Sequence, residues 1–123
     1  MCGIIGYSGP KEPLPILING LSRLEYRGYD SAGIAISDGN KITVEKKEGK
    51  LEVLKNHLKD NNIKGNIGIG HTRWATHGVP NDVNAHPHSD NNEEFAIIHN
   101  GIIENYAEIK KDLLEEGFEF KSD

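Results

Sequence analysis

The spacing of apolar residues along the chain predicts a series of short strands and helices. A β-branched and aromatic run over residues 3–7 predicts a strand. After Pro13, leucine and isoleucine recur every three or four residues as far as Leu24, which predicts a helix with one buried face. Residues 26–33 have no such period and are expected to form a loop.

The middle of the chain predicts a hairpin, a second helix and a further strand. Residues 33–37 and 41–46 are rich in strand formers, and they flank the turn-forming sequence DGN at 38–40. Leucines spaced through residues 51–58 predict a short helix. Isoleucine and glycine then alternate in a predicted strand that runs into residues 71–74.

A long polar segment separates these elements from the last ones. Residues 75–94 contain two prolines and no period, and loops of this length in a domain are usually functional or disordered. Residues 95–99 predict a strand, and a helix with an apolar face is expected from about Asn105 to Gly117. Residues 118–120 predict one more strand.

This mixture of helices and strands, with at least one hairpin, predicts an α+β fold built on antiparallel sheet. The chain has 123 residues, which is enough for one domain with a core. The last predicted strand lies almost at the end of the chain, where it has little to pair with. We therefore expect the chain to be a portion of a larger domain.

Composition and charge narrow the class of protein. Hydrophobic residues make up 36% and charged residues 27%, as in soluble globular proteins. A formal net charge of −5 argues against nucleic acid or an anionic membrane as the main partner. No apolar stretch approaches membrane-spanning length, and the first residues lack the basic segment of a signal peptide. A cytoplasmic protein is expected.

The position of Cys2 suggests chemistry. It is the only cysteine, so it has no intrachain disulfide partner. Because residue 2 is small, an aminopeptidase can remove Met1, which leaves a thiol and an α-amine on one residue. The amine has an ordinary pKa of ~7.7–8.0, so it can act as the base that activates the thiol. The alternative is a small apolar residue at a chain end.

Five runs of sequence carry a resemblance to a known family. They are, in order, MCGIIG at 1–6, LEYRGYDSAG at 24–33, GHTRWATHG at 70–78, NAHPH at 84–88 and HNGIIEN at 99–105. Together they resemble the glutaminase domain of the glutamine:fructose-6-phosphate aminotransferases. These are class II amidotransferases within the N-terminal-nucleophile hydrolases. Glutaminase domains of other class II amidotransferases are the alternative.

The resemblance implies antiparallel sheets sandwiched between helical layers, with residues 1–123 as the N-terminal portion of a type-2 glutamine amidotransferase domain. It implies hydrolysis of glutamine to glutamate and ammonia. In the full enzyme, sugar isomerase domains, absent from this chain, use the ammonia to convert fructose 6-phosphate to glucosamine 6-phosphate. The partners implied are glutamine and those domains, with no cofactor and no metal.

The same resemblance assigns catalytic roles. Cys2 is the nucleophile, and Asn100 with Gly101 forms the oxyanion hole. Donors of this kind are typically worth ~2.7–4 kcal/mol each in the transition state. The ordinary reading of an isolated Asn-Gly pair is a turn.

Substrate-binding roles follow in the same way. Arg73 resembles the residue that holds the α-carboxylate of glutamine, and its planar guanidinium suits a bidentate pair with a carboxylate. Thr76 and His77 resemble further substrate contacts. The commoner alternative for all three is ordinary surface or loop polarity.

Three more residues are expected to gate or shape the site. Trp74 resembles a tryptophan that gates the path of ammonia, with a core aromatic as the alternative. Arg27 and Asp30 resemble a loop beside the nucleophile, and a structural ion pair between them is the simpler reading. The aspartate that binds the α-amino group in the family would lie beyond Asp123.

Two functions of other classes stay open at this point. A metal-binding module would use the loop histidines, which are His71, His77, His86, His88 and His99. Against it, the sequence contains neither an HExxH nor a CxxC arrangement, and scattered loop histidines are more often hydrogen-bonded structure. An inert interaction module would tolerate replacement of Cys2 by alanine.

Overall fold

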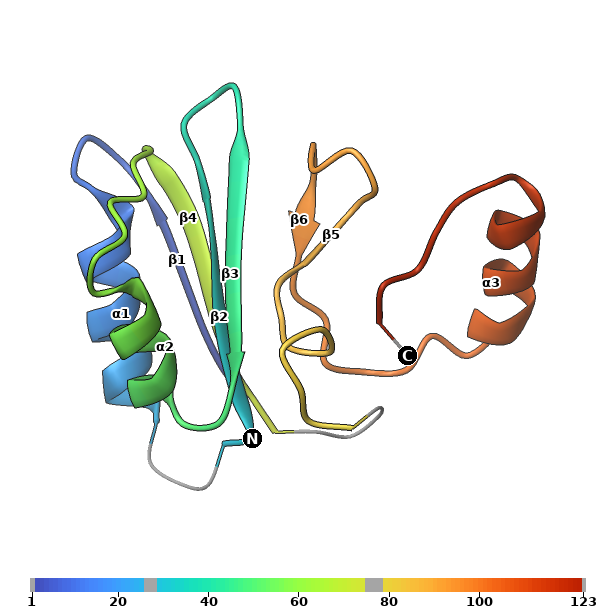
Figure 1. Cartoon of the computed structure of the whole chain (residues 1–123), viewed down its shortest axis with the longest axis horizontal. Helices are drawn as coiled ribbons and strands as arrows, with labels where there is room; N and C mark the ends of the chain where they lie inside the picture. Colours follow the sequence, from blue (N-terminus) through green and yellow to red (C-terminus); the bar gives the residue numbers. More distant parts are fainter. Residues whose placement is uncertain (1, 26–28, 75–78, 123) are drawn as a thin grey trace.

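The computed structural model describes residues 2–25, 29–74 and 79–122. Within them, the structure contains both strands and helices, and Figure 1 shows their arrangement. The elements are β1 (Gly3–Ser8), α1 (Pro13–Leu24), β2 (Ser31–Ser37), β3 (Ile42–Glu48), α2 (Leu51–Leu58), β4 (Ile67–Arg73), β5 (His88–Ser89), β6 (Ala96–Ile97) and α3 (Tyr106–Glu115).

Four of the strands form one antiparallel sheet in the order β1-β4-β2-β3. β1 is therefore an edge strand, although it comes first in the chain, and it pairs with β4 rather than with β2. The register places Gly3 opposite Thr72 and Ser8 opposite Ile67. The start of β1 and the end of β4 consequently meet at one end of the sheet.

Helices α1 and α2 cover one face of this sheet (Figure 1). Strand residues alternate in direction, so Ile34 and Ile36 of β2 point to this face. They pack with Leu17, Leu21 and Leu54, and all five side chains are fully or almost fully buried. The predicted helices α1 and α2 and their buried leucine faces are confirmed.

The opposite face is only partly covered. The segment that leads into β5 lies on it, and the backbone carbonyl of His86 packs directly against Gly33. A Cβ on Gly33 would come within 2.1 Å of that carbonyl oxygen, so only glycine permits this contact. Ile4 and Ile67 are 59% and 50% exposed.

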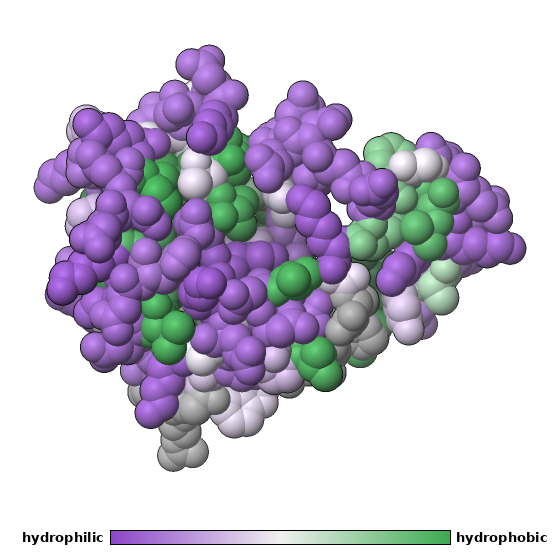
Figure 2. Space-filling view, in the orientation of Figure 1, coloured by the Kyte–Doolittle hydropathy of each residue, from purple (hydrophilic) through white to green (hydrophobic). Residues whose placement is uncertain are grey.

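Helix α3 forms where it was predicted, but none of its residues is buried. In Figure 1 it stands apart from the four-stranded sheet, and Figure 2 shows apolar side chains at the surface there. The exposed apolar residues of α3 and its surroundings are Ile102, Ile103, Tyr106, Ile109, Leu114, Phe118 and Phe120. The apolar face of α3 is thus real, but nothing in the described residues covers it.

The strand predicted at residues 118–120 is wrong. These residues have no strand pairing, because among the described residues no neighbouring strand supplies a backbone partner. Instead, the side-chain amide of Asn91 donates to the Glu119 carbonyl at 2.7 Å and accepts from the Glu119 N–H at 3.0 Å. One side chain thereby makes the two hydrogen bonds that a strand neighbour would make.

Three boundaries also differ from the predictions. The loop predicted at residues 26–33 is too long, because β2 already begins at Ser31, where it pairs with both β3 and β4. The polar segment 75–94 contains β5, and the strand predicted at 95–99 is reduced to the two residues of β6. No helix in the described part of the chain is both long and apolar enough to span a membrane.

The contact at Gly33 can be tested by adding one methyl group. Gly33→Ala places a Cβ against the His86 backbone, and we expect it to lower the free energy of unfolding by about 1–3 kcal/mol. Gly6→Ala is the matched control, since a Cβ on Gly6 of the same sheet would meet nothing within 4 Å. Urea unfolding measures both. Equal effects of the two substitutions would contradict the close packing of this segment on β2.

Candidate active site

The thiol of Cys2 lies between two hydrogen-bond donors from distant parts of the chain. The Trp74 N–H donates to Sγ at 3.3 Å, and the side-chain amide of Asn100 donates to it at 2.8 Å. The thiol lies 3.9 Å from the Trp74 carbonyl oxygen. Cys2 itself is partly exposed. The structure therefore brings together the predicted nucleophile and the predicted oxyanion-hole asparagine.

The pairing of β1 with β4 creates this arrangement. Cys2 directly precedes β1, and Trp74 directly follows β4. Because the two strands are antiparallel, the residue before one start lies beside the residue after the other end. Asn100 reaches the same point from the segment after β6.

Asn100 uses its amide nitrogen twice. Besides the thiol, Nδ2 donates to the Trp74 carbonyl at 2.7 Å. An amide NH2 has two N–H donors, so both contacts can be made at once. The following residue, Gly101, is exposed, and a Cβ there would lie 2.9 Å from the imidazole Nε2 of His99. The side chain of Asn100 therefore lies at the thiol, while Gly101 lies beside the His99 ring.

Arg73 and Asp30 are joined through their backbones. Arg73 is the last residue of β4 and is 2% exposed. Its carbonyl accepts from the Asp30 N–H at 3.1 Å, and the Asp30 carbonyl accepts from the Gly49 N–H at 2.7 Å. The Asp30 carboxylate accepts from the Ser31 hydroxyl at 3.2 Å. Asp30 thus fixes the end of β4 from the side of β2.

The remaining predicted site residues divide into two groups. Trp74 contacts the site through its backbone, while its residue surface is 48% exposed, so it is not a core aromatic. Arg27, Thr76 and His77 lie outside the described residues. The ion pair suggested between Arg27 and Asp30 therefore lies outside them as well.

Three histidines form a stack beside Arg73. The ring of His86 meets the ring of His71 at 4.8 Å and that of His88 at 4.5 Å, both edge to face. His71 is fully buried, and neither of its ring nitrogens hydrogen-bonds a partner among the described residues. The expectation of hydrogen-bonded loop histidines is wrong for His71, because it lies in β4 and is covered by the segment that packs on Gly33.

Burial dominates the electrostatics of this stack. Burial, and after it the nearby His86, Arg73 and His88, lower the pKa of His71 to about 3. The pKa values of His86 and His88 fall to about 4, again chiefly through burial, with Arg73 and Lys46 contributing. All three rings are therefore neutral near pH 7.

Lys46 adds to the positive potential on this face. Its ammonium donates to the Val83 carbonyl at 2.9 Å. Burial, with a smaller contribution from Lys121, lowers the pKa of Lys46 to about 8, while Asp82 opposes the shift. A partly buried region with Arg73 and Lys46 favours an anion. No group of three or more His, Cys, Asp or Glu side chains in the described ranges could hold a metal ion.

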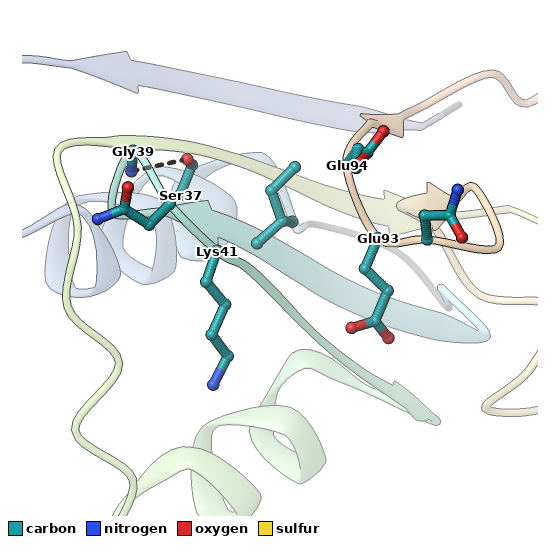
Figure 3. A pocket seen from close by; sticks show the side chains of 8 residues that line it. Ser37, Gly39, Lys41, Glu93 and Glu94 are labelled. Carbon is teal, nitrogen blue, oxygen red and sulfur yellow. Dashed lines mark hydrogen bonds between the residues drawn. The ribbon is translucent and has the colours of Figure 1, made fainter.

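A second hollow lies at the other end of the sheet (Figure 3). It is a pocket of about 380 Å³ between the β2–β3 turn and the β5–β6 turn. Lys41, Glu93 and Glu94 contribute its charges. Since the β2–β3 turn is at the Ser37↔Ile67 end of the register, this pocket is remote from Cys2.

Sequence reasoning missed one contact of the nucleophile segment. The buried hydroxyl of Thr72 accepts a hydrogen bond from the Gly3 N–H at 3.2 Å. A threonine in a strand carries no signal of such a role. The signal would have been the pairing of β1 with β4, which places Gly3 opposite Thr72.

Comparison with protein families gives one match. The family model described as "Glutamine amidotransferase domain" matches residues 56–123, which is more than half of the chain.

Curated relatives match the whole chain. Those of Clostridium perfringens and Fusobacterium nucleatum, both named glutamine--fructose-6-phosphate aminotransferase (isomerizing), are 60% and 62% identical to it. The alignment with each covers 100% of this chain but 20% of the relative. The chain thus spans about a fifth of the length of these relatives.

Two solved structures have a similar fold. The glutamine phosphoribosylpyrophosphate amidotransferase of B. subtilis has a TM-score of 0.76 and 34% identity over 97% of this chain and 26% of its own. A structure titled as the allosteric regulatory enzyme of purine biosynthesis has a TM-score of 0.80 and 32% identity over 98% and 27%. The antiparallel sheet with helices agrees with the α+β prediction.

The buried histidines make stability depend on pH. The unfolded chain binds protons at histidine as the pH falls below about 6.5, whereas folded His71 and His86 stay neutral down to about 3 and about 4. Their contribution is therefore complete above pH 6.5 and is lost as the pH falls from 6.5 to about 4 for His86 and to about 3 for His71. Each costs up to about 1.4 kcal/mol per pH unit in that window.

Urea unfolding between pH 7 and pH 4 measures this slope. We expect His71→Leu to reduce the slope of unfolding free energy against pH by the equivalent of about one bound proton. Leu54→Ala is the control, because it removes a buried side chain and keeps every histidine. An unchanged slope in His71→Leu would mean that His71 titrates normally in the folded chain.

Proposed function

We propose that this chain, which belongs to the glutamine amidotransferase domain family, carries the glutamine-hydrolysing site of its parent protein. The observation that carries the proposal is the position of the Cys2 thiol between the Trp74 N–H and the Asn100 amide. The Cys2 thiolate attacks the side-chain amide carbon of glutamine, and the C–N bond breaks to give a thioester and ammonia. Water then hydrolyses the thioester to glutamate and regenerates the thiol.

The base in this proposal is the α-amine of Cys2 after removal of Met1. An α-amine with an ordinary pKa of ~7.7–8.0 takes the thiol proton near neutral pH and passes it to the departing ammonia. One residue therefore supplies both the nucleophile and the base. The partial exposure of Cys2 is compatible with access by a small substrate.

Asn100 and Gly101 are proposed to stabilise the oxyanion of the tetrahedral intermediate. The Asn100 amide already points at the reacting thiol from 2.8 Å. As the substrate oxygen gains charge beside that sulfur, the same N–H can turn to it over a short distance. The Gly101 N–H is the second donor in this proposal.

Arg73 is proposed to hold the α-carboxylate of glutamine. It directly precedes Trp74, whose backbone N–H donates to the thiol, and this position in the chain supports the proposal. Burial of Arg73 strengthens its attraction for a carboxylate, because the local dielectric is low. Thr76 and His77 are proposed as further substrate contacts, Trp74 as the ammonia gate, and Arg27 and Asp30 as residues that shape the site.

The wider reaction is proposed from the relatives. Their shared name supports fructose 6-phosphate as the acceptor of the ammonia. The sugar would be bound by sugar isomerase domains outside this chain. Identities of 60% and 62% to those relatives, against 34% and 32% to the two purine enzymes, favour this acceptor over phosphoribosylpyrophosphate. We place the enzyme in the cytoplasm.

Residues 1–123 are proposed to form the N-terminal portion of the amidotransferase domain. The exposure of Ile4 and Ile67 on one face of the sheet, and of the apolar face of α3, supports further strands that cover both. The two-residue strands β5 and β6 also support a second sheet that is extended by other residues.

Labelling with an electrophilic glutamine analogue tests the nucleophile. We expect the intact mass of the purified chain to lack Met1 and to increase by one analogue, with excess glutamine preventing the increase. Because Cys2 is the only thiol, Cys2→Ala removes the adduct without leaving another cysteine to react. Retention of Met1, or labelling that glutamine does not slow, would contradict the mechanism.

The oxyanion role of Asn100 is tested by the rate of the same labelling. Asn100→Ala removes the donor at 2.8 Å from the thiol, and we expect the rate to fall by about 10²–10³-fold. Asn62→Ala, at an exposed position after α2, is the matched control and should label at the parental rate. A parental rate in Asn100→Ala would exclude this amide as a catalytic donor.

A further inference from the structure

Thr72 makes a buried contact with the nucleophile segment. It lies in β4, is fully buried, and its hydroxyl accepts a hydrogen bond from the Gly3 N–H at 3.2 Å. The register of β1 with β4 places these two residues directly opposite each other. The side chain of Thr72 thereby hydrogen-bonds the backbone of the residue opposite it.

The fit between Thr72 and Gly3 is close. A Cβ on Gly3 would lie 2.7 Å from the Thr72 hydroxyl oxygen and 2.9 Å from the Cβ of Leu24. Separations under 3.0 Å require some atom to shift, so residue 3 can be only glycine in this packing. The peptide between Cys2 and Gly3 is thus held between the hydroxyl and α1.

Holding this peptide also constrains Cys2. The peptide unit is planar, so a fixed Gly3 N–H fixes the carbonyl carbon and the Cα of Cys2. The other end of the residue is fixed as well, because Sγ accepts hydrogen bonds from the Trp74 N–H and the Asn100 amide. Two of the three heavy-atom substituents of Cα are then anchored.

The third substituent is the α-nitrogen, and tetrahedral geometry leaves it one position. We propose that Thr72 is a positioning residue for the nucleophile. Its hydroxyl holds the Cys2–Gly3 peptide so that the α-amine and the thiol keep the orientation needed for proton transfer between them. This inference rests on the proposed function, in which the amine is the base.

The simpler role for Thr72 is that of a β-branched strand residue that fills space. The two roles have different consequences. Space filling affects stability alone, whereas positioning affects the rate of the chemical step. Displacement of a reacting group by about 1 Å can cost about 10²-fold in rate, while the binding of substrate is unchanged.

Thr72→Val separates these roles, because valine keeps the shape and removes the hydroxyl. The measurement is the concentration dependence of labelling by the electrophilic glutamine analogue, which gives a maximal rate and a half-saturating concentration. We expect Thr72→Val to lower the maximal rate by about 10–100-fold and to leave the half-saturating concentration within about 2-fold. Thr72→Ser, which restores the hydroxyl, should label within about 3-fold of the parental rate.

Thr43→Val is the matched control. Thr43 lies in β3 of the same sheet and pairs with Ile36 near the β2–β3 turn, at the end of the sheet away from Cys2. Urea unfolding of each variant shows whether the labelled protein is folded. If Thr72→Val is unfolded, Thr72→Ala tests the same loss of the hydroxyl without a branched side chain.

The outcomes are distinct. A parental maximal rate in folded Thr72→Val, or a Thr72→Ser variant as slow as Thr72→Val, would overturn the positioning role and leave the proposed function standing. Failure of the parental chain itself to label at Cys2 would overturn the proposed function, and the positioning role with it. A slow Thr72→Val with a rescued Thr72→Ser and an unaffected Thr43→Val supports the inference.

Discussion

The pairing of β1 with β4 is the constraint on which the site depends. It is a contact between segments almost seventy residues apart, and its register, Gly3 opposite Thr72, brings the residue before one strand to the residue after the other. A slip of one residue would turn every β1 side chain to the other face and remove Gly3 from the Thr72 hydroxyl. The thiol, the Trp74 backbone and the Thr72 hydroxyl hold their relative positions only in this register.

The two faces of the sheet differ in the side chains that they bury. On one face, α1 and α2 bury leucines and isoleucines, and this packing gives the sheet its rigidity. On the other, neutral histidines are buried beside Arg73 and Lys46, which costs stability at acid pH. Ionisable groups with shifted pKa values commonly gather at functional sites, and here the supporting core lies on the opposite face.

Periodicity was sufficient for the parts of the fold that are local. The leucine spacing of α1 and α2 and the DGN turn of the first hairpin specify those elements without help from distant residues. Periodicity wrongly predicted a strand at residues 118–120. A strand needs a backbone partner, and the described residues supply only the Asn91 side chain. For the proposed site, motif resemblance predicted Cys2 and Asn100, which the structure places in contact, whereas the contact of Thr72 with Gly3 follows only from a register that no local pattern contains.

The hydrogen bonds of Asn100 describe the proposed site in the absence of substrate. Its amide nitrogen is 2.8 Å from the thiol and 2.7 Å from the Trp74 carbonyl, so the resting structure uses both of its N–H groups. A buried or half-buried donor left without an acceptor would cost about 1–3 kcal/mol. In the proposed reaction, a substrate oxygen replaces the sulfur as acceptor in the transition state, so this N–H keeps an acceptor throughout. The proposed oxyanion donor therefore has no unpaired N–H before substrate binds, because the Cys2 thiol accepts its hydrogen bond.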